Sequence, residues 1–195
     1  MTKQLEDRDL PELNEAYQKV LYWFFSFPNI EASLNNLASE LDIAKTTAKK
    51  VVKLMEDEGF LIKKVYGHAW RITCNQKHVY NYTKKITFNL SMVFDAYVGG
   101  LREEILKIVE NTDSVILFGS YRKGDDTEKS DIDIAVEVSD NEELSIVNLG
   151  VISNFGYRKN VTVNLHIFCR NKVDVNLFSN IANGIVLEGF LEVKP

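Results

Sequence analysis

The sequence predicts an α+β protein with two domains: a small helical domain closed by a β-hairpin, followed by an α/β domain with a mixed sheet. Within residues 12–58, apolar residues recur at helical spacing in three separate segments, and two short strand patterns follow around Gly67. Two further apolar runs, 115–118 and 134–136, flank a polar loop and are typical of buried strands. We therefore predict a first domain over 1–75, a mostly helical connector over 76–95 and a second domain over 96–195.

Composition and charge exclude several classes of protein. Of the 195 residues, 45% are hydrophobic and 11% aromatic, which is typical of a globular protein with real cores. The net charge of −5 argues against a generally basic nucleic-acid coat protein. Cys74 and Cys169 form neither a disulfide framework nor a zinc motif. No segment has the length of a membrane span and the N-terminus is charged, so we expect a cytoplasmic protein with no membrane partner.

The first domain is predicted helix by helix. Residues 12–27 form an amphipathic pattern that ends before Pro28, which cannot continue a helix. Ser33 is a suitable N-cap for a second, short helix, because its hydroxyl can accept from a backbone N–H of the first turn. The third helix is predicted over 45–58 and ends at Gly59, a residue that readily adopts the left-handed conformation after a helix.

A β-hairpin completes this domain, with predicted strands at 60–66 and 69–73. Helix, helix, turn, helix and hairpin follow in the order of a winged helix-turn-helix. The segment Leu37–Ile62, with Thr46-Thr47-Ala48 and Gly59-Phe60-Leu61-Ile62, resembles MarR-like and related archaeal winged-helix regulators. The resemblance implies a homodimer as a possible state and double-stranded DNA as a partner.

Charge is segregated along the chain in a way that supports this expectation. Residues 43–71 contain seven Lys or Arg against three Asp or Glu, so they carry +4 while the rest of the chain carries −9. A helix in the major groove needs lysines for phosphates and short polar side chains near its N-terminus for base edges. The alternatives are a solvated helix face or a winged helix used for protein contacts. The predicted DNA-binding residues are Lys45, Thr46, Thr47, Lys49, Lys50, Lys53, Lys63, Lys64 and Arg71.

The most informative motif lies in the second domain. Gly119-Ser120 follows an apolar run, and Asp131-Ile132-Asp133 begins the next one after a gap of ten residues. Side chains alternate along a strand, so the two aspartates point to one face and can hold a divalent metal together. The Gly-Ser turn presents backbone amides and a hydroxyl to a phosphate. The alternative for such a segment is a charged hairpin loop.

This motif resembles that of the nucleotidyltransferase superfamily that includes DNA polymerase beta, and most closely its minimal members. The resemblance covers about 96–195. It implies that Asp131 and Asp133 bind Mg²⁺ or Mn²⁺, and that Gly119 and Ser120 hold the phosphates of an NTP. Arg122 and Lys123 follow the turn and are candidates to neutralise phosphate charge, with a solvated surface turn as the alternative.

The remaining elements of the second domain follow from its apolar pattern. We predict one strand before the motif, one strand that begins at its aspartates and a third strand later in the chain. Helices precede, separate and follow these strands, and an apolar tail packs on the sheet. The predicted ranges are helices at 96–110, 141–155 and 174–183, strands at 114–118, 131–138 and 161–168, and the tail at 184–193.

The third carboxylate that active family members carry on a neighbouring strand is not evident. On the strand 161–168 the face that can look into the site holds Asn164 and His166, neither of which is a carboxylate. His166 could serve as ligand or base in its place. Glu137 shares the face of Asp133 but lies too far along the strand, and Asp174 lies past it.

Three functional hypotheses remain open from the sequence. The first is a winged-helix nucleotidyltransferase that moves NMP from Mg·NTP to an unknown acceptor hydroxyl. The second is a transcription regulator whose nucleotidyltransferase-like domain binds a nucleotide without turnover. The third is a partner-modifying or antitoxin-like protein, for which the sequence shows no helical partner domain.

Overall fold

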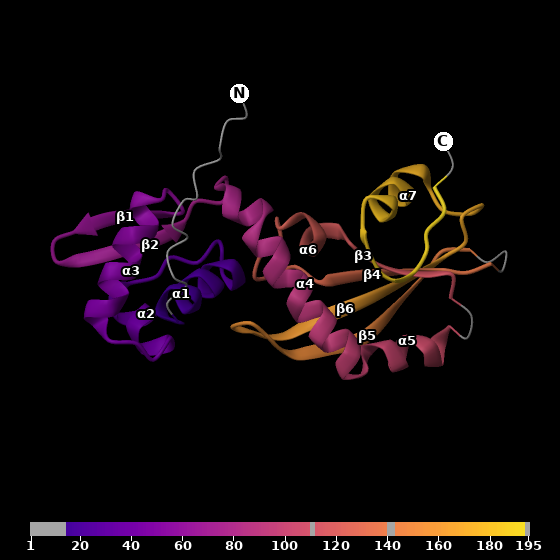
Figure 1. Cartoon of the computed structure of the whole chain (residues 1–195), viewed down its shortest axis with the longest axis horizontal. Helices are drawn as coiled ribbons and strands as arrows, with labels where there is room; N and C mark the ends of the chain where they lie inside the picture. Colours follow the sequence, from indigo (N-terminus) through magenta and orange to yellow (C-terminus); the bar gives the residue numbers. More distant parts are fainter. Residues whose placement is uncertain (1–14, 110–111, 140–142, 194–195) are drawn as a thin grey trace, which may run out of the picture. The chain divides into compact units, whose positions relative to one another are not determined.

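The computed structural model describes residues 15–109, 112–139 and 143–193, and the chain divides into two compact units, Met1–Asn75 and Gln76–Pro195 (Figure 1). The segment 76–95, predicted as a connector, is part of the second unit, which therefore begins about twenty residues before the predicted boundary at 96. No helix among the described residues has the length and apolar character needed to cross a membrane.

The N-terminal unit contains three helices followed by an antiparallel hairpin. Ser33 accepts a hydrogen bond from Asn36 N at 3.1 Å and so caps the second helix as predicted. Ala32 forms an isolated antiparallel bridge with Ile72, which ties the segment before α2 to the hairpin. Residues 12–14 of the predicted first helix lie outside the described residues. The elements are α1 (Glu15–Ser26), α2 (Leu34–Glu40), α3 (Lys45–Asp57), β1 (Leu61–Tyr66) and β2 (Ala69–Cys74).

The core of this unit joins its helices to its hairpin. Apolar residues of α3 recur on one face and are buried, which leaves the lysines of that helix in solvent. Phe25 of α1 meets Phe60, just before β1, edge to face with ring centroids 5.7 Å apart. Tyr17 of α1 donates a hydrogen bond to Glu58, which follows α3, at 2.6 Å. These contacts hold α3 in place with its polar face outward.

The C-terminal unit is built on a five-stranded sheet of order β5-β6-β4-β3-β7. β4 and β6 are parallel and the other neighbours antiparallel, so the prediction of a mixed sheet is confirmed. The strands are β3 (Ser114–Phe118), β4 (Ile132–Glu137), β5 (Ser145–Phe155), β6 (Arg158–Phe168) and β7 (Ile185–Gly189). The helices are η1 (Val79–Tyr82), α4 (Lys84–Ala96), η2 (Tyr97–Leu101), α5 (Arg102–Ile108), α6 (Gly119–Lys123) and α7 (Val175–Ala182).

The predicted helix over 141–155 is wrong, because most of this segment is the long strand β5. The segment is rich in β-branched residues and pairs with β6 along nearly its whole length. A bulge between Asn148 and Gly150, where Gly150 has φ of 102°, interrupts the alternation that would have identified a strand. Residues 141 and 142 of the predicted helix lie outside the described residues.

Two further ranges differ from the prediction. The helix expected over 96–110 is divided, because η2 contains a kink at Gly100, where φ is 132°. The apolar tail 184–193 does pack on the sheet, but it does so as strand β7, which pairs with β3 at the edge.

The two faces of the sheet are covered differently. Ile116, Phe118, Ala135 and Phe168 lie on one face and pack against Ile181 of α7. In Figure 1, α7 lies beside β3 while α4 and α5 run past the lower part of the sheet. By the strand registers, the same face that carries α7 also carries Asp133 and its neighbours on β6.

Candidate active site

The strand registers bring the polar motif residues together where β3 ends and β4 begins, in the middle of the sheet. Asp131 immediately precedes β4, and Asp133 is opposite Phe118 at the end of β3 and opposite Asn164 in β6. Because paired residues in adjacent strands point to the same face, Asp133 and Asn164 are neighbours across the sheet. Asp131 is exposed and Asp133 is half-buried, so both carboxylates remain accessible to a ligand.

Gly119 is required at its position for two reasons. Its φ is +72°, a conformation that other residues adopt only at a cost. A Cβ atom placed on Gly119 would also lie 2.7 Å from Asp133 Oδ2. The glycine therefore keeps free the space beside the Asp133 carboxylate and lets the turn pass close to it.

The two residues in place of a third acid both contact the aspartates. His166 Nε2 lies 3.2 Å from Asp133 Oδ1, and Asn164 Nδ2 lies 3.4 Å from Asp131 Oδ2. The other ring nitrogen of His166, Nδ1, is buried and has no hydrogen-bond partner. A proton on that atom would be left without an acceptor, so we infer that the proton is on Nε2 and that His166 donates to Asp133. In this tautomer His166 orients Asp133, and its Nε2 is not free to ligate a metal.

The structure excludes the other two acids that were considered for the site. Glu137 is buried and receives two hydrogen bonds from Arg170, at 2.8 and 3.1 Å. Asp174 caps α7 by accepting from Asn176 N at 2.8 Å. Among the residues that the structure describes, no group of three or more His, Cys, Asp and Glu is arranged to hold a metal ion.

The phosphate-binding candidates lie on the short helix α6. Ser120 and Arg122 are half-buried, and Lys123 is exposed with its Nζ 3.3 Å from Asn180 Oδ1 of α7. α6 ends at Gly124, whose φ is +77°. The turn therefore sits directly beside Asp133, and Lys123 points toward α7.

A buried ion pair anchors the loop between α6 and β4. Lys85 of α4 and Asp126 of the loop are 1% and 3% exposed, with Lys85 Nζ 3.2 Å from Asp126 Oδ1 and 2.5 Å from Asp126 O. Asn89 donates to the same carboxylate at 2.7 Å. Burial raises the pKa of Asp126, and the attraction of Lys85 opposes that rise.

A second buried contact holds the end of this loop. Arg158, at the start of β6, donates to the carbonyl oxygen of Ser130 at 2.7 Å and also to the hydroxyl of Tyr121. Ser130 directly precedes Asp131, so Arg158 fixes the backbone that presents the first aspartate. Burial raises the pKa of Tyr121, which keeps the phenol neutral beside the guanidinium.

Sequence reasoning missed these anchoring residues. Lys85 and Asp126 are 41 positions apart, and Tyr121 and Arg158 are 37 apart. A lysine in a mixed polar segment and an aspartate in a charged loop carry no signal of burial, because each is a typical surface residue by itself. Only the fold brings them together.

The comparisons with known proteins bear on this unit. Residues 103–191 match the family model described as Polymerase beta, Nucleotidyltransferase. This part of the C-terminal unit is similar to the nucleotidyltransferase domains of the polymerase beta superfamily. The match includes Gly119, Ser120, Asp131 and Asp133, and it leaves the N-terminal unit outside. No curated protein matches the chain.

Nucleotidyltransferases of this superfamily typically use divalent metal ions, and the donor set of the site fits such an ion. Asp131 and Asp133 supply accessible carboxylate oxygens, which Mg²⁺ and Mn²⁺ prefer. These two residues would hold the ion.

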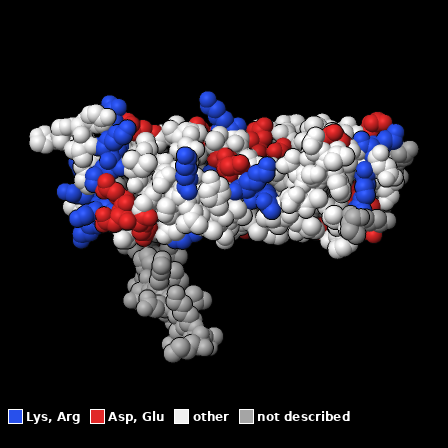
Figure 2. All heavy atoms as spheres, turned by 90° about the horizontal axis from the view of Figure 1, so that it is seen from above, with Lys and Arg blue, Asp and Glu red and all other residues white. Residues whose placement is uncertain are grey.

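The predicted DNA-binding residues of the N-terminal unit fall into two groups. Figure 2 shows Lys and Arg side chains gathered over the part of this unit that holds α3 and the hairpin, with Asp and Glu next to them. Lys63 pairs with Glu56, and Arg71 pairs with Glu31 at 3.4 Å, so their charges are partly neutralised. The others are exposed on α3 or β1, except for the half-buried Thr47: Lys45, Thr46, Thr47, Lys49, Lys50, Lys53 and Lys64.

Proposed function

We propose that the C-terminal unit binds Mg·NTP and transfers its NMP group to an acceptor hydroxyl. The observation that supports this most is the Gly119 turn lying directly against the Asp133 carboxylate, with Asp131 on the same face. A bound divalent ion neutralises phosphate charge and polarises the phosphorus that is attacked. Ser120 and the amides of the turn hold the outer phosphates, and Arg122 and Lys123 add positive charge.

The protein's own residues orient these groups. His166 donates to Asp133 and Asn164 to Asp131, so each carboxylate is held by one residue of β6. Arg158 and the Lys85–Asp126 pair hold the two ends of the intervening loop on the body of the unit. The turn and the aspartates thus keep their spacing when a nucleotide arrives.

Calorimetric titration tests the binding half of this proposal. We expect the wild type to bind NTP only when Mg²⁺ or Mn²⁺ is present, and Asp131→Ala to abolish that binding because one of two metal carboxylates is lost. Asp125→Ala is the matched control, since Asp125 is an exposed aspartate of the same loop. Equal binding by Asp131→Ala and the wild type would contradict the proposal.

A second prediction concerns the third acid. Asn164→Asp should raise turnover of radiolabelled NTP with candidate acceptors, because it places a carboxylate beside Asp131 and Asp133 that can serve as base for the acceptor hydroxyl. His166→Asp should be compared, and it should help less, because it removes the hydrogen bond that orients Asp133. Brisk wild-type turnover that survives Asn164→Ala and His166→Ala would show that the third ligand lies elsewhere.

We further propose that the N-terminal unit is a winged helix that binds double-stranded DNA through the polar face of α3 and the hairpin. The support is the run of exposed lysines opposite the buried face of α3, together with the net charge of +4 over residues 43–71. A chain that bound nucleotide without turnover would then act as a nucleotide-sensing regulator in the cytoplasm. A homodimer would suit a palindromic DNA site.

Gel-shift titration with salt tests this second proposal. Lys50→Ala should weaken duplex binding on every sequence and lower the salt slope by about one unit, as expected for one lost phosphate contact. Thr46→Ala should instead relax sequence preference, because a short polar side chain near the N-terminus of α3 contacts base edges. No duplex affinity at low salt would favour a winged helix that contacts proteins.

A further inference from the structure

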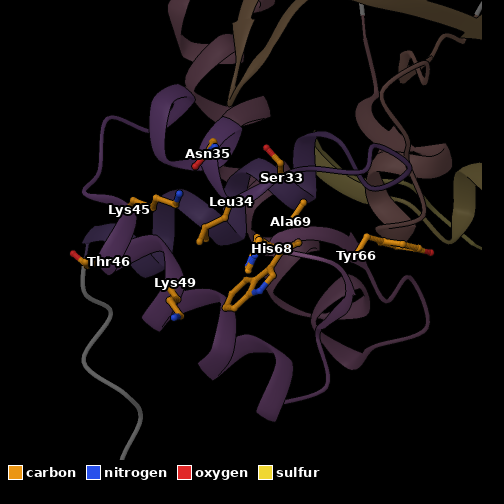
Figure 3. Close-up of a pocket in the computed structure, with 10 residues that line it drawn as sticks. Ser33, Leu34, Asn35, Lys45, Thr46, Lys49, Tyr66, His68 and Ala69 are labelled. Carbon is orange, nitrogen blue, oxygen red and sulfur yellow. The ribbon is translucent and has the colours of Figure 1, made fainter.

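The N-terminal unit contains a cavity of about 610 Å³ that borders the proposed DNA-binding face and shares Lys45, Thr46 and Lys49 with it. Three elements enclose it: the start of α2, the first turns of α3, and the turn and second strand of the hairpin. Figure 3 shows Lys45, Thr46 and Lys49 of α3 along one side, with His68 and Ala69 of the hairpin across from them. The volume falls in the range of small-molecule sites, so the cavity is too large for a single ion.

Three kinds of chemistry meet in this cavity. Trp70 supplies an aromatic ring, and the ammonium groups of Lys63 and Lys49 lie 4.5 Å and 5.7 Å from its centre. Lys45 and Lys49 supply two positive charges, and no Asp or Glu of the described chain lines the cavity. Leu34 gives an apolar wall, and the exposed side chains of Asn35 and Thr46 offer an amide and a hydroxyl at the rim.

Each simpler occupant leaves part of this lining unused. An inorganic anion would satisfy the lysines but would leave Trp70 and Leu34 in contact with water. An apolar molecule would cover Trp70 but would remove water from two lysines without pairing them, which is costly. A nucleotide has a flat base for the indole, a phosphate for the lysines and sugar hydroxyls for the polar rim, and stacking on an aromatic ring is tolerant of base identity.

We propose that this cavity is a nucleotide-binding site in which a base stacks on Trp70 and its phosphate pairs with Lys45 and Lys49. The nucleotide can come as a free mononucleotide or as an unpaired residue of a nucleic-acid strand, since both present the same base and phosphate. The described residues that line the site include no carboxylate to hold a metal, so we expect binding here not to depend on Mg²⁺. This property separates the site from the one at Asp131 and Asp133.

Fluorescence quenching of Trp70 tests the proposal on the full chain. The titration is done in EDTA with the Asp131→Asn/Asp133→Asn variant. Both conditions remove metal-dependent nucleotide binding in the C-terminal unit. This test and the test of the proposed transferase can therefore fail independently. Free tryptophan in the same buffer controls for absorption by the base. Trp23, the other tryptophan, is buried against Phe24 and Phe27, so a ligand in the cavity does not reach it.

The ligands are AMP, a short single-stranded oligonucleotide, the matching blunt duplex, inorganic phosphate and benzoate. Saturable quenching by AMP identifies a free nucleotide as the ligand, and quenching by the single strand alone identifies an unpaired residue; either result supports the proposal. The proposal is overturned if only the duplex quenches, or if benzoate quenches and AMP does not. It is also overturned if neither AMP nor the single strand quenches.

Variants assign the two halves of the ligand to the two halves of the site. Lys45→Ala and Lys49→Ala should each weaken binding about tenfold, the effect of losing a charge-assisted contact. Lys19→Ala is the matched control, because Lys19 is a lysine of the same unit that pairs with Glu15 away from the cavity. Trp70→Ala, measured by calorimetry because the reporter is lost, should also weaken binding about tenfold, and Trp70→Phe should retain most of it. Unchanged affinity in Lys45→Ala, Lys49→Ala and Trp70→Ala would overturn the proposal.

Discussion

Replacing Lys85 by methionine should lower the free energy of unfolding of the C-terminal unit by about 3–5 kcal/mol, the usual cost of leaving one partner of a buried ion pair uncompensated. Asp126 is almost fully buried, and Asn89 would remain its main donor after the lysine is removed. Urea denaturation followed by circular dichroism measures the effect. Lys129→Met is the matched control, because Lys129 is an exposed lysine of the same loop region.

The pH dependence of this variant has a definite sign. Burial raises the pKa of Asp126 in the folded state above the ordinary value of an aspartate, so at a pH between the unfolded and the folded pKa the folded protein binds a proton that the unfolded protein has released. Without Lys85 that pKa rises further, and stability increases as pH falls from the raised folded value toward the unfolded one. We therefore expect the loss of unfolding free energy in Lys85→Met, relative to the wild type, to become smaller as the solution is acidified. A loss under about 1 kcal/mol at neutral pH, or a loss that grows at lower pH, would contradict the burial argument.

A double substitution separates the loss of a charge pair from the loss of packing. In Lys85→Met/Asp126→Leu both charges are gone, and apolar replacements of a buried pair are often neutral or stabilising. We expect this variant to recover most of the stability that Lys85→Met loses. If nucleotide binding falls while stability recovers, the pair also serves to hold the loop that carries Asp131.

Gly119→Ala should have the largest effect on function with the smallest change in structure. The added Cβ would lie 2.7 Å from Asp133 Oδ2, so either the turn or the carboxylate must move. A displacement of about 1 Å in a catalytic arrangement can lower turnover on the order of 10²-fold. The left-handed backbone, with φ of +72°, adds a stability cost of about 1–2 kcal/mol.

Metal-dependent nucleotide binding and turnover are both measured on this variant, with thermal unfolding as the check on the fold. Gly99→Ala is the matched control: Gly99 is in the same unit, and a Cβ there would meet nothing within 4 Å. Nucleotide binding and turnover by Gly119→Ala equal to those of Gly99→Ala would show that the turn does not need to approach Asp133. It would also remove the main support for the proposed phosphate site.

The local parts of the fold were accessible from the sequence because short-range chemistry dictates them. Ser33 caps α2 and Gly59 follows α3, both as predicted. The strands around the motif, Ser114–Phe118 and Ile132–Glu137, agree with their predicted ranges to within one residue because buried strands are short, uninterrupted apolar runs. The alternation of a strand predicted that Asp131 and Asp133 share one face, and the resemblance of the motif to nucleotidyltransferases predicted Gly119 and Ser120 beside them.

The parts that failed are those that depend on long-range pairing. β5 was predicted as a helix because its bulge at Gly150 breaks the strand period, and only its pairing with β6 makes it a strand. β7 was predicted only as an apolar tail that packs on the sheet, and its pairing with β3, about seventy residues earlier in the chain, makes it a strand. A strand at an edge with exposed side chains has little signal of its own, since hydrogen bonds to its neighbour determine it.

For the candidate site, the residue types, their spacing and the family resemblance predicted which groups would meet a metal and a phosphate: Gly119, Ser120, Asp131 and Asp133. The tertiary structure decided the rest. Parallel pairing of β4 with β6 sets His166 and Asn164 against the aspartates, while Arg170 withdraws Glu137 from the site. The buried pair of Lys85 and Asp126 likewise exists only in the folded chain. The energy of a charge depends on the solvent and the partners that surround it, and the tertiary structure determines both.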